Sequence, residues 1–304
     1  MAGLQIGLGV STSPGPGVDP VAEARLAEEL GFDYVSASDH LNGTTASYEP
    51  WTLLTAIAAT TARIKVLSRV LAVPYRNPAV LAKMAETLDR LSGGRLILGL
   101  GGGFVDDEFR AFGLPVPTNR DRVDGVAEQI AIARAIWTQP SATFEGRLHR
   151  VENAVVEPKP EHRIPIWLGM YKRRGLALTG READGWIPSI GFAPPPVVVG
   201  LWEQVRSAAR AAGRDPSEIT AAYNMLVRVG DEQPGNVMTI AGPAESITQQ
   251  LIAFTELGFT SFSLVPAGAD RMDQIERLGT GVLPALRNRV GDKAPPGSPA
   301  ATRA

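Results

Sequence analysis

The sequence contains no cysteine and only three histidines among its 304 residues. Without cysteine, the chain cannot form a disulfide bond, bind zinc through thiolates or use a thiol as a nucleophile. The three histidines, His40, His149 and His162, lie far apart in the sequence, and a histidine-based metal site needs more ligands than they readily supply. We therefore expect no metal ion. The G-x-S-x-G pattern of a serine nucleophile is also absent.

Long apolar runs and an excess of one charge are lacking as well. No apolar run approaches the roughly 20 residues that a membrane helix needs. The first residues, MAGLQIGLGVSTSPG, have no basic region and are interrupted by glycine and proline, unlike a signal peptide. The formal net charge is −2 and the isoelectric point is near 6.0, which gives no general attraction to nucleic acids or anionic membranes. We expect a cytoplasmic protein with neither as a partner.

The sequence does have a regular alternation of short apolar strands and amphipathic helices. Hydrophobic residues make up 44% of the chain, enough for a large core. Apolar positions recur at helical spacing in 78–91, 121–137 and 243–257. Strands that alternate with helices run parallel, and eight of them make a (β/α)8 barrel, the α/β fold that we predict here. The candidate strands are 4–10, 33–38, 64–71, 95–100, 164–168, 184–189, 220–229 and 261–265.

The segment between the fourth and fifth candidate strands is too long for a simple crossover. Residues 102–163 contain the 121–137 helix and the stretch FEGRLHRVENAVVEP, which alternates like a small hairpin. We interpret this segment as an insertion after strand 4. The end of the chain, 291–304, is rich in proline, glycine and alanine, and we expect it to be disordered. The sequence thus predicts one barrel domain over 1–290.

The stretch SGGRLILGLGGGF, residues 92–104, has the glycine content of a dinucleotide-binding loop. The G-x-G-x-x-G pattern fails, however, because its third glycine would fall on Phe104, and the acidic residue expected about 20 positions later is missing. In a barrel, Gly101–Gly103 would lie at the carboxyl end of strand 4, where active sites form. Two interpretations stay open. The glycines either let a flat ring approach the backbone or only shape a tight exit from the strand.

Several segments taken together resemble the luciferase-like monooxygenase family, which includes the F420-dependent oxidoreductases. The resemblance covers nearly the whole chain and implies a (β/α)8 barrel. It is carried by ELGFDYVSASDHL (29–41), VLAVPYRNPAVLAKMAETLDRLSGGRLILGLGGG (70–103), DEFRAFG (107–113), the helix 120–137, PIWLGM (165–170) and READGWIP (181–188).

The resemblance implies roles for the residues that end the second and third strands. It implies that Asp39 contacts the cofactor and that His40 donates a proton or stabilises developing charge. The alternative is that both residues are structural. It also implies a non-prolyl cis peptide bond between Arg69 and Val70 that supports the cofactor ring. The alternative there is an ordinary strand with a charged end.

Further positions follow from the same resemblance. It implies that Gly102, Gly103 and Asp107 contact the cofactor and that Glu108 is structural. Relatives that oxidise sugar phosphates carry a glutamate where this chain has Phe104, which disfavours that substrate and favours a hydrophobic one.

A cofactor phosphate is expected where the fifth strand joins the next helix. A helix N-terminus and three successive cations favour an anion there, whereas a solvated basic loop is the alternative. The residues concerned are Gly169, Met170, Tyr171, Lys172, Arg173 and Arg174.

The function that the resemblance implies is F420-dependent hydride transfer to or from a small organic substrate. An FMN-dependent monooxygenase supplied by a partner reductase is the first alternative. A non-catalytic flavin or deazaflavin carrier is the second. The family also implies a homodimer.

Overall fold

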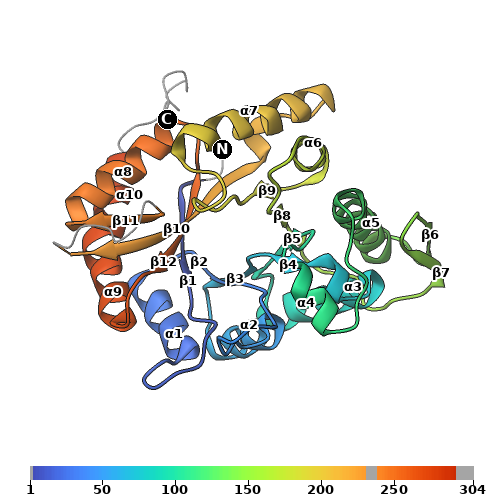
Figure 1. Ribbon diagram of the computed structural model, residues 1–304, viewed down its shortest axis with the longest axis horizontal. Helices are drawn as coiled ribbons and strands as arrows, with labels where there is room; N and C mark the ends of the chain where they lie inside the picture. Colours follow the sequence, from blue (N-terminus) through green and yellow to red (C-terminus); the bar gives the residue numbers. More distant parts are fainter. Residues whose placement is uncertain (1–2, 231–237, 292–304) are drawn as a thin grey trace, which may run out of the picture.

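Eight parallel strands form a closed barrel in the computed structural model, which describes residues 3–230 and 238–291 (Figure 1). The barrel closes because β1 pairs with both β2 and β12, while β9 pairs with both β8 and β10. Each predicted strand overlaps one strand of the observed barrel, so the predicted (β/α)8 barrel is confirmed. The strands are β1 (Gln5–Gly9), β2 (Tyr34–Ala37), β3 (Lys65–Ser68), β5 (Leu96–Gly101), β8 (Ile166–Leu168), β9 (Gly185–Trp186), β10 (Thr220–Val229) and β12 (Ser261–Pro266).

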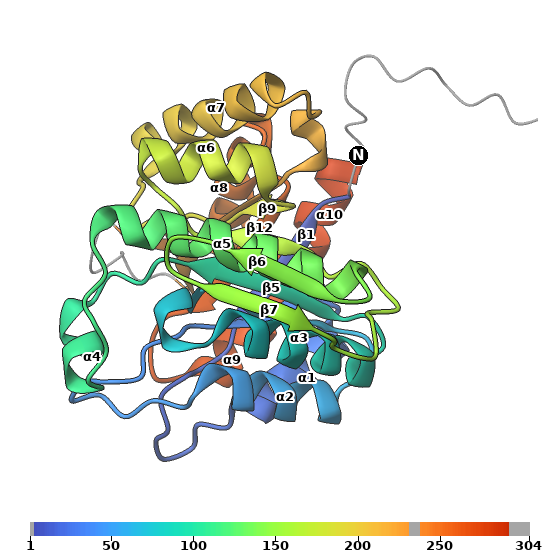
Figure 2. The same ribbon diagram turned by 90° about the vertical axis from the view of Figure 1, so that its right-hand side faces the viewer.

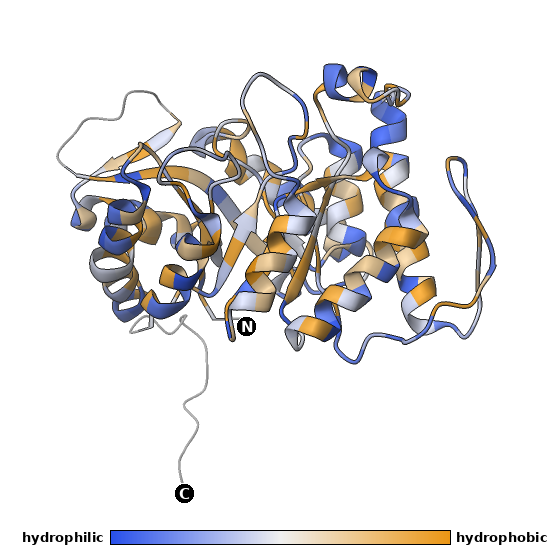
Figure 3. Ribbon diagram, turned by 90° about the horizontal axis from the view of Figure 1, so that it is seen from below, coloured by the Kyte–Doolittle hydropathy of each residue, from blue (hydrophilic) through white to orange (hydrophobic). Residues whose placement is uncertain are grey.

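Helices cover the outside of the barrel, and local sequence signals set their ends. Asp19, Asn77 and Thr118 each accept a hydrogen bond from a first-turn N–H, and Gly31 and Gly93 end helices in the left-handed conformation. Hydrophobic residues gather on the strands and on the helix faces that cover them (Figure 3). The helices are α1 (Pro20–Leu30), α2 (Pro50–Thr60), α3 (Pro78–Ser92), α5 (Asn119–Thr138), α6 (Arg173–Glu182), α7 (Pro195–Ala211), α8 (Ala244–Glu256), α9 (Arg271–Arg277) and α10 (Leu283–Gly291).

The segment 102–163 is only partly an insertion, which corrects the prediction. Helix α5 packs between α3 and α6 and is therefore the ordinary crossover helix of the barrel. The additions are α4 (Asp106–Ala111) and the predicted hairpin of β6 (Ala142–Glu145) and β7 (Arg150–Ala154), which lies outside α3 and α5 (Figure 2).

Several short elements of the described residues were not predicted, three of which border the barrel strands. Strand β4 (Leu71–Ala72) and the 3-10 helix η1 (Val73–Tyr75) continue the chain after β3, and β11 (Thr239–Gly242) pairs with the outer end of β10. The predicted disordered tail lies outside the described residues, apart from Gly291, which ends α10. None of the described helices has both the length and the apolar character to cross a bilayer.

Candidate active site

A cavity of about 680 Å³ opens at the carboxyl ends of the barrel strands. This is the end at which barrel enzymes carry their active sites, and the volume suits a cofactor or a small molecule. Twelve of the thirteen predicted site residues line it. They are Asp39, His40, Arg69, Val70, Gly102, Gly103, Gly169, Met170, Tyr171, Lys172, Arg173 and Arg174.

Asp107 is the predicted residue that the structure does not bring into the cavity. Its side chain is 86% exposed, and its carboxylate pairs with Arg110 on the same short helix, α4. The neighbouring Glu108 lines the cavity instead. The prediction that Asp107 lies at the site is therefore wrong. Of the three successive acids Asp106, Asp107 and Glu108, the prediction chose Asp107 as the cofactor contact, but its side chain points to solvent.

Asp39 lies buried after β2 and is held by a residue that the sequence did not reveal. Its carboxylate accepts two hydrogen bonds from Arg76, of 2.8 and 3.1 Å, and one from the Ala72 N–H at 2.8 Å. Arg76 also donates to Glu49 at 2.5 Å. Burial alone would lower the pKa of Arg76, but the bonds to both carboxylates outweigh it and raise that pKa. Asp39 therefore occupies a fixed, fully paired position.

His40 is half-exposed at the cavity and is oriented by a buried carboxylate. Its Nδ1 lies 3.2 Å from Oε1 of Glu108, whose Oε2 accepts a hydrogen bond of 2.5 Å from the Tyr75 hydroxyl. Burial and that hydrogen bond raise the pKa of Tyr75, so its hydroxyl stays protonated and donates. The carboxylate then accepts the proton on Nδ1, which leaves Nε2 of His40 to act toward the cavity.

The cis peptide bond between Arg69 and Val70 is present, as predicted. It lies in a bulge between β3 and β4 that crosses close over β5. A Cβ added to Gly99 would lie 1.7 Å from the Ser68 carbonyl oxygen, and one added to Gly101 would lie 2.7 Å from Val70 Cγ2. The bulge thus gives Gly99 and Gly101 a structural role in β5. Gly101–Gly103 still line the cavity.

Four aromatic rings form a row along one wall of the cavity. The ring of His40 meets Phe104 edge-on at 5.5 Å between centroids, Phe104 meets Phe192 at 5.2 Å, and Phe192 meets Tyr171 at 5.5 Å. Phe104 and Phe192 are each more than half exposed, which is unusual for large apolar side chains. The row therefore offers an apolar surface to a ligand. Phe192 was not predicted.

The start of α6 presents positive charge to the same cavity. No side chain caps this helix, so its first N–H groups lack that partner. Lys172 and Arg173 line the cavity and form no ion pair with an acidic side chain in the described part of the chain. Such a helix start with unpaired cations suits an anionic group.

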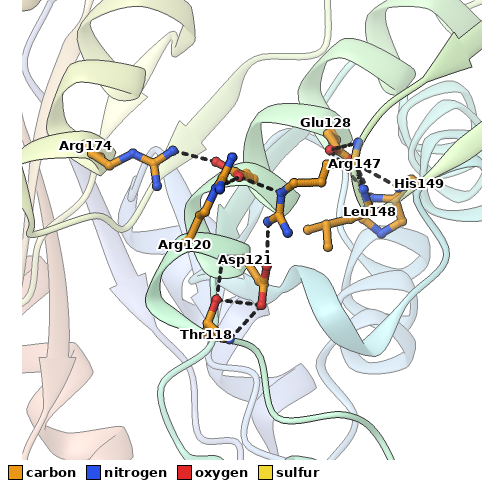
Figure 4. Close-up of polar contacts among 9 residues, drawn as sticks. Thr118, Arg120, Asp121, Glu128, Arg147, Leu148, His149 and Arg174 are labelled. Atoms are coloured by element: carbon orange, nitrogen blue, oxygen red, sulfur yellow. Dashed lines mark hydrogen bonds and ion pairs between the residues drawn. The ribbon is translucent and has the colours of Figure 1, made fainter.

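Arg174, the third cation of this run, also lines the cavity, but its guanidinium is paired with an acidic side chain. It donates to Asp124 of α5 at 2.6 Å, and Asp124 also accepts from Arg120 and Arg147 (Figure 4). The predicted trio of cations is thus reduced to a pair.

The loop between β6 and β7 is clamped onto α5 beside this network. Glu128 accepts hydrogen bonds from the N–H groups of Arg147, Leu148 and His149 and also contacts the His149 ring, as Figure 4 shows. His149 is therefore a structural residue. In the part of the chain that the structure describes, no three acidic or histidine side chains are placed to share a metal ion.

Comparisons with known proteins agree with this geometry. Residues 5–234 match the sequence model of the luciferase-like monooxygenase family. An F420-dependent glucose-6-phosphate dehydrogenase of Nakamurella multipartita is 28% identical over 88% of this chain and 92% of its own. Among solved structures, an F420-dependent secondary alcohol dehydrogenase in complex with an F420-acetone adduct superposes with a TM-score of 0.84, at 22% identity, over 94% of this chain and all of its own. The monooxygenase RslO1 of Streptomyces bottropensis gives 0.80 at 22% identity, over 92% of this chain and 99% of its own.

Proposed function

The chain belongs to the luciferase-like monooxygenase family, and we propose that it is an oxidoreductase that uses coenzyme F420 for hydride transfer to or from a small organic substrate. The observation that carries this proposal is that one cavity joins the oriented His40 to the cationic start of α6. The F420 dependence of the relatives named above supports the choice of cofactor.

The residues around the cavity fit a deazaflavin with a phosphate-bearing side chain. The main chain of Arg69 and Val70, together with Gly102, Gly103 and Met170, offers a largely apolar wall for a flat ring. Gly169, Tyr171, Lys172 and Arg173 surround the α6 start, where a phosphate would gain from free N–H groups and unpaired cations. When bound, the deazaflavin supplies the hydride acceptor or donor.

The chain's own residues supply proton handling and positioning. His40, held through Nδ1 by Glu108, exchanges a proton with the substrate oxygen at Nε2. Asp39, fixed by Arg76, borders the cofactor and keeps the end of β2 and the start of β4 in place through the Ala72 N–H.

The aromatic row disfavours a sugar phosphate as substrate. Phe104 occupies the place of the glutamate that sugar-phosphate dehydrogenases of the family carry, and it contacts His40 directly. An apolar wall next to the proton donor suits a hydrophobic alcohol or carbonyl compound.

An FMN-dependent monooxygenase is the second candidate, supported by the likeness to RslO1. An FMN-dependent monooxygenase function would require a partner reductase that supplies reduced flavin. The family also favours a homodimer, which light scattering coupled to gel filtration would test.

Titration of the purified protein with F420 and with FMN, followed by fluorescence, tests the cofactor. We expect saturable F420 binding that weakens with salt, because the phosphate subsite is cationic. Tight FMN binding without an F420 response would overturn the proposal. A non-catalytic carrier would bind F420 but give no turnover with any panel of alcohols or carbonyl compounds.

A further inference from the structure

A positively charged side chain lies at the floor of the cavity without an acidic partner. The Arg69 Nε donates to Ser36 Oγ at 3.1 Å, and its Nη1 donates to Asn224 Oδ1 at 2.9 Å. Among the described residues, no carboxylate lies within ion-pairing distance of this guanidinium. Two other largely buried arginines, Arg76 and Arg271, pair with Asp39 and Glu23. Arg95, which is also buried, has no carboxylate partner but donates five hydrogen bonds to Thr61 and to main-chain carbonyls.

The neutral partners of Arg69 are themselves fixed. Ser36 contacts the Ser263 hydroxyl at 3.1 Å, and the Asn224 amide donates to Ser189 Oγ at 2.8 Å. A guanidinium has five N–H groups, and the bonds to Ser36 and Asn224 use two of them. The other three, on Nη1 and Nη2, have no partner in the described part of the chain, while the residue lines the cavity. They are therefore available to a ligand.

The surroundings leave this charge uncompensated. Burial lowers the pKa of Arg69 to about 10, and the charged or ionisable groups that act on it are Tyr34, Tyr171 and Arg271. The guanidinium thus remains charged at neutral pH, at a cost that its neutral neighbours only partly offset. An anion that enters from the cavity would supply the missing counter-charge.

The cavity that Arg69 lines also has apolar walls. Ile187 and Val70 line it, and the aromatic row starts beside the floor, because the Tyr171 hydroxyl accepts a hydrogen bond from the Ser189 N–H. The row then leads through Phe192 and Phe104 to His40. A ligand that satisfies both surfaces has an anionic end and an apolar body.

We propose that the substrate carries a carboxylate that binds the Arg69 guanidinium and an apolar body that packs along the aromatic row. This inference rests on the proposed function and specifies its substrate class. The carboxylate takes two N–H groups of Nη1 and Nη2 in the two-point geometry that arginine favours. The peptide bond of Arg69 supports the cofactor, whereas its side chain selects the substrate.

Calorimetric titration with a matched pair of probes tests this assignment. The probes are 3-phenylpropanoate and its neutral amide, added to the full chain with and without saturating F420. We expect the carboxylate to bind about tenfold or more tightly than the amide, because a charge-assisted hydrogen bond is lost with the amide. Arg69→Gln should remove that preference, and Arg277→Gln, which deletes an equal charge on exposed α9, should keep it.

A second variant tests the same carboxylate preference even if Arg69→Gln folds poorly. Asn224→Asp has the same shape and places a carboxylate on Arg69, so it should abolish the preference for the carboxylate probe while the amide binds as before. Equal affinities of both probes for the wild type would overturn the inference, as would a preference that persists in Asn224→Asp. If Arg69→Gln instead weakens F420 and spares the probes, Arg69 serves the cofactor and the inference is wrong. Failure of F420 to bind the wild type would contradict the proposed function instead.

Discussion

At the scale of single residues, the roles of Glu108 and Asp107 separate cleanly. Glu108 is buried against His40 and Tyr75, whereas Asp107 is exposed and pairs within α4. Glu108→Gln removes the carboxylate that orients the imidazole, so we expect kcat to fall about tenfold or more while the Kd of F420 and KM change little. Turnover, followed by F420 absorbance with a substrate that the wild type accepts, measures this effect.

The neighbouring carboxylate provides the control for that experiment. Asp107→Asn should leave kcat unchanged. Loss of activity in both variants to the same degree would show that α4 matters only as a structural unit. The double variant Glu108→Gln/His40→Ala should have a kcat only slightly below that of Glu108→Gln alone. Both changes disable the same proton-transfer unit, so their effects should not add.

The buried pair of Asp39 and Arg76 makes a prediction about stability. Arg76→Ala leaves a buried carboxylate without its partner, and such losses cost about 3–5 kcal/mol in the free energy of unfolding. Arg277→Ala breaks an exposed pair with Asp273 on α9 and should cost about 0.3–0.5 kcal/mol. Urea denaturation of both variants measures the difference. Similar small losses would mean that water or a neighbour replaces Arg76.

Most of the site residues that the sequence predicted do line the cavity, but few of their partners were predicted. Asp39, His40 and the 169–173 segment were predictable because they follow strands of a recognisable fold. Arg76, Asn224, Ser189 and Phe192 were not, since their roles depend on contacts between strands far apart in the chain. Asp107 was chosen over Glu108 because three successive acids give no sign of which one faces inward.

At the scale of elements, the bulge between β3 and β4 requires a residue without a side chain in the neighbouring strand β5. Gly99 has no room for a side chain, because its Cβ would meet the Ser68 carbonyl oxygen at 1.7 Å. We expect Gly99→Ala to destabilise the fold by about 3 kcal/mol or to prevent folding, since backbone must move. Gly200→Ala, in the open interior of α7, should instead stabilise by about 0.5–1 kcal/mol through helix propensity. Thermal denaturation compares the two, and a tolerated Gly99→Ala contradicts the packing argument.

The strands were the most predictable elements, because their apolar runs are short and regularly spaced. All eight predicted ranges overlapped a barrel strand, but β11 was missed, since Thr239–Gly242 pairs with the carboxyl end of β10 and lacks a clear apolar run. The helix α5 was assigned to an insertion because the long segment around it hid its contacts with α3 and α6.

The contacts between α5 and the β6–β7 loop should make a pH-dependent contribution to the stability of the fold. Hydrogen bonds from Thr118 and then from Arg147 lower the pKa of Asp121 to about 2. A depressed folded-state pKa contributes stability above the unfolded value near 4, and this contribution disappears as pH falls through about 2. In Arg147→Ala the pKa of Asp121 should rise toward its ordinary value. A carboxyl NMR titration measures it, and the control is Arg150→Ala, which removes an exposed pair with Glu152. An unchanged titration would show that the clamp does not persist in solution.

At the scale of the whole molecule, the first and last strands of the barrel pair with each other. Residues 5–8 of β1 pair with 261–264 of β12, so no part of the barrel can close without the last strand. We therefore predict that the chain unfolds as one cooperative domain, although all five tryptophans lie between residues 51 and 202. Tryptophan fluorescence and far-UV circular dichroism should give one common midpoint. F420 at 100 times its Kd should add about 2.7 kcal/mol and raise both midpoints together by roughly 5 °C. Two separate transitions, or a shift in the fluorescence midpoint alone, would mean that the cofactor stabilises only the half of the barrel that carries α6.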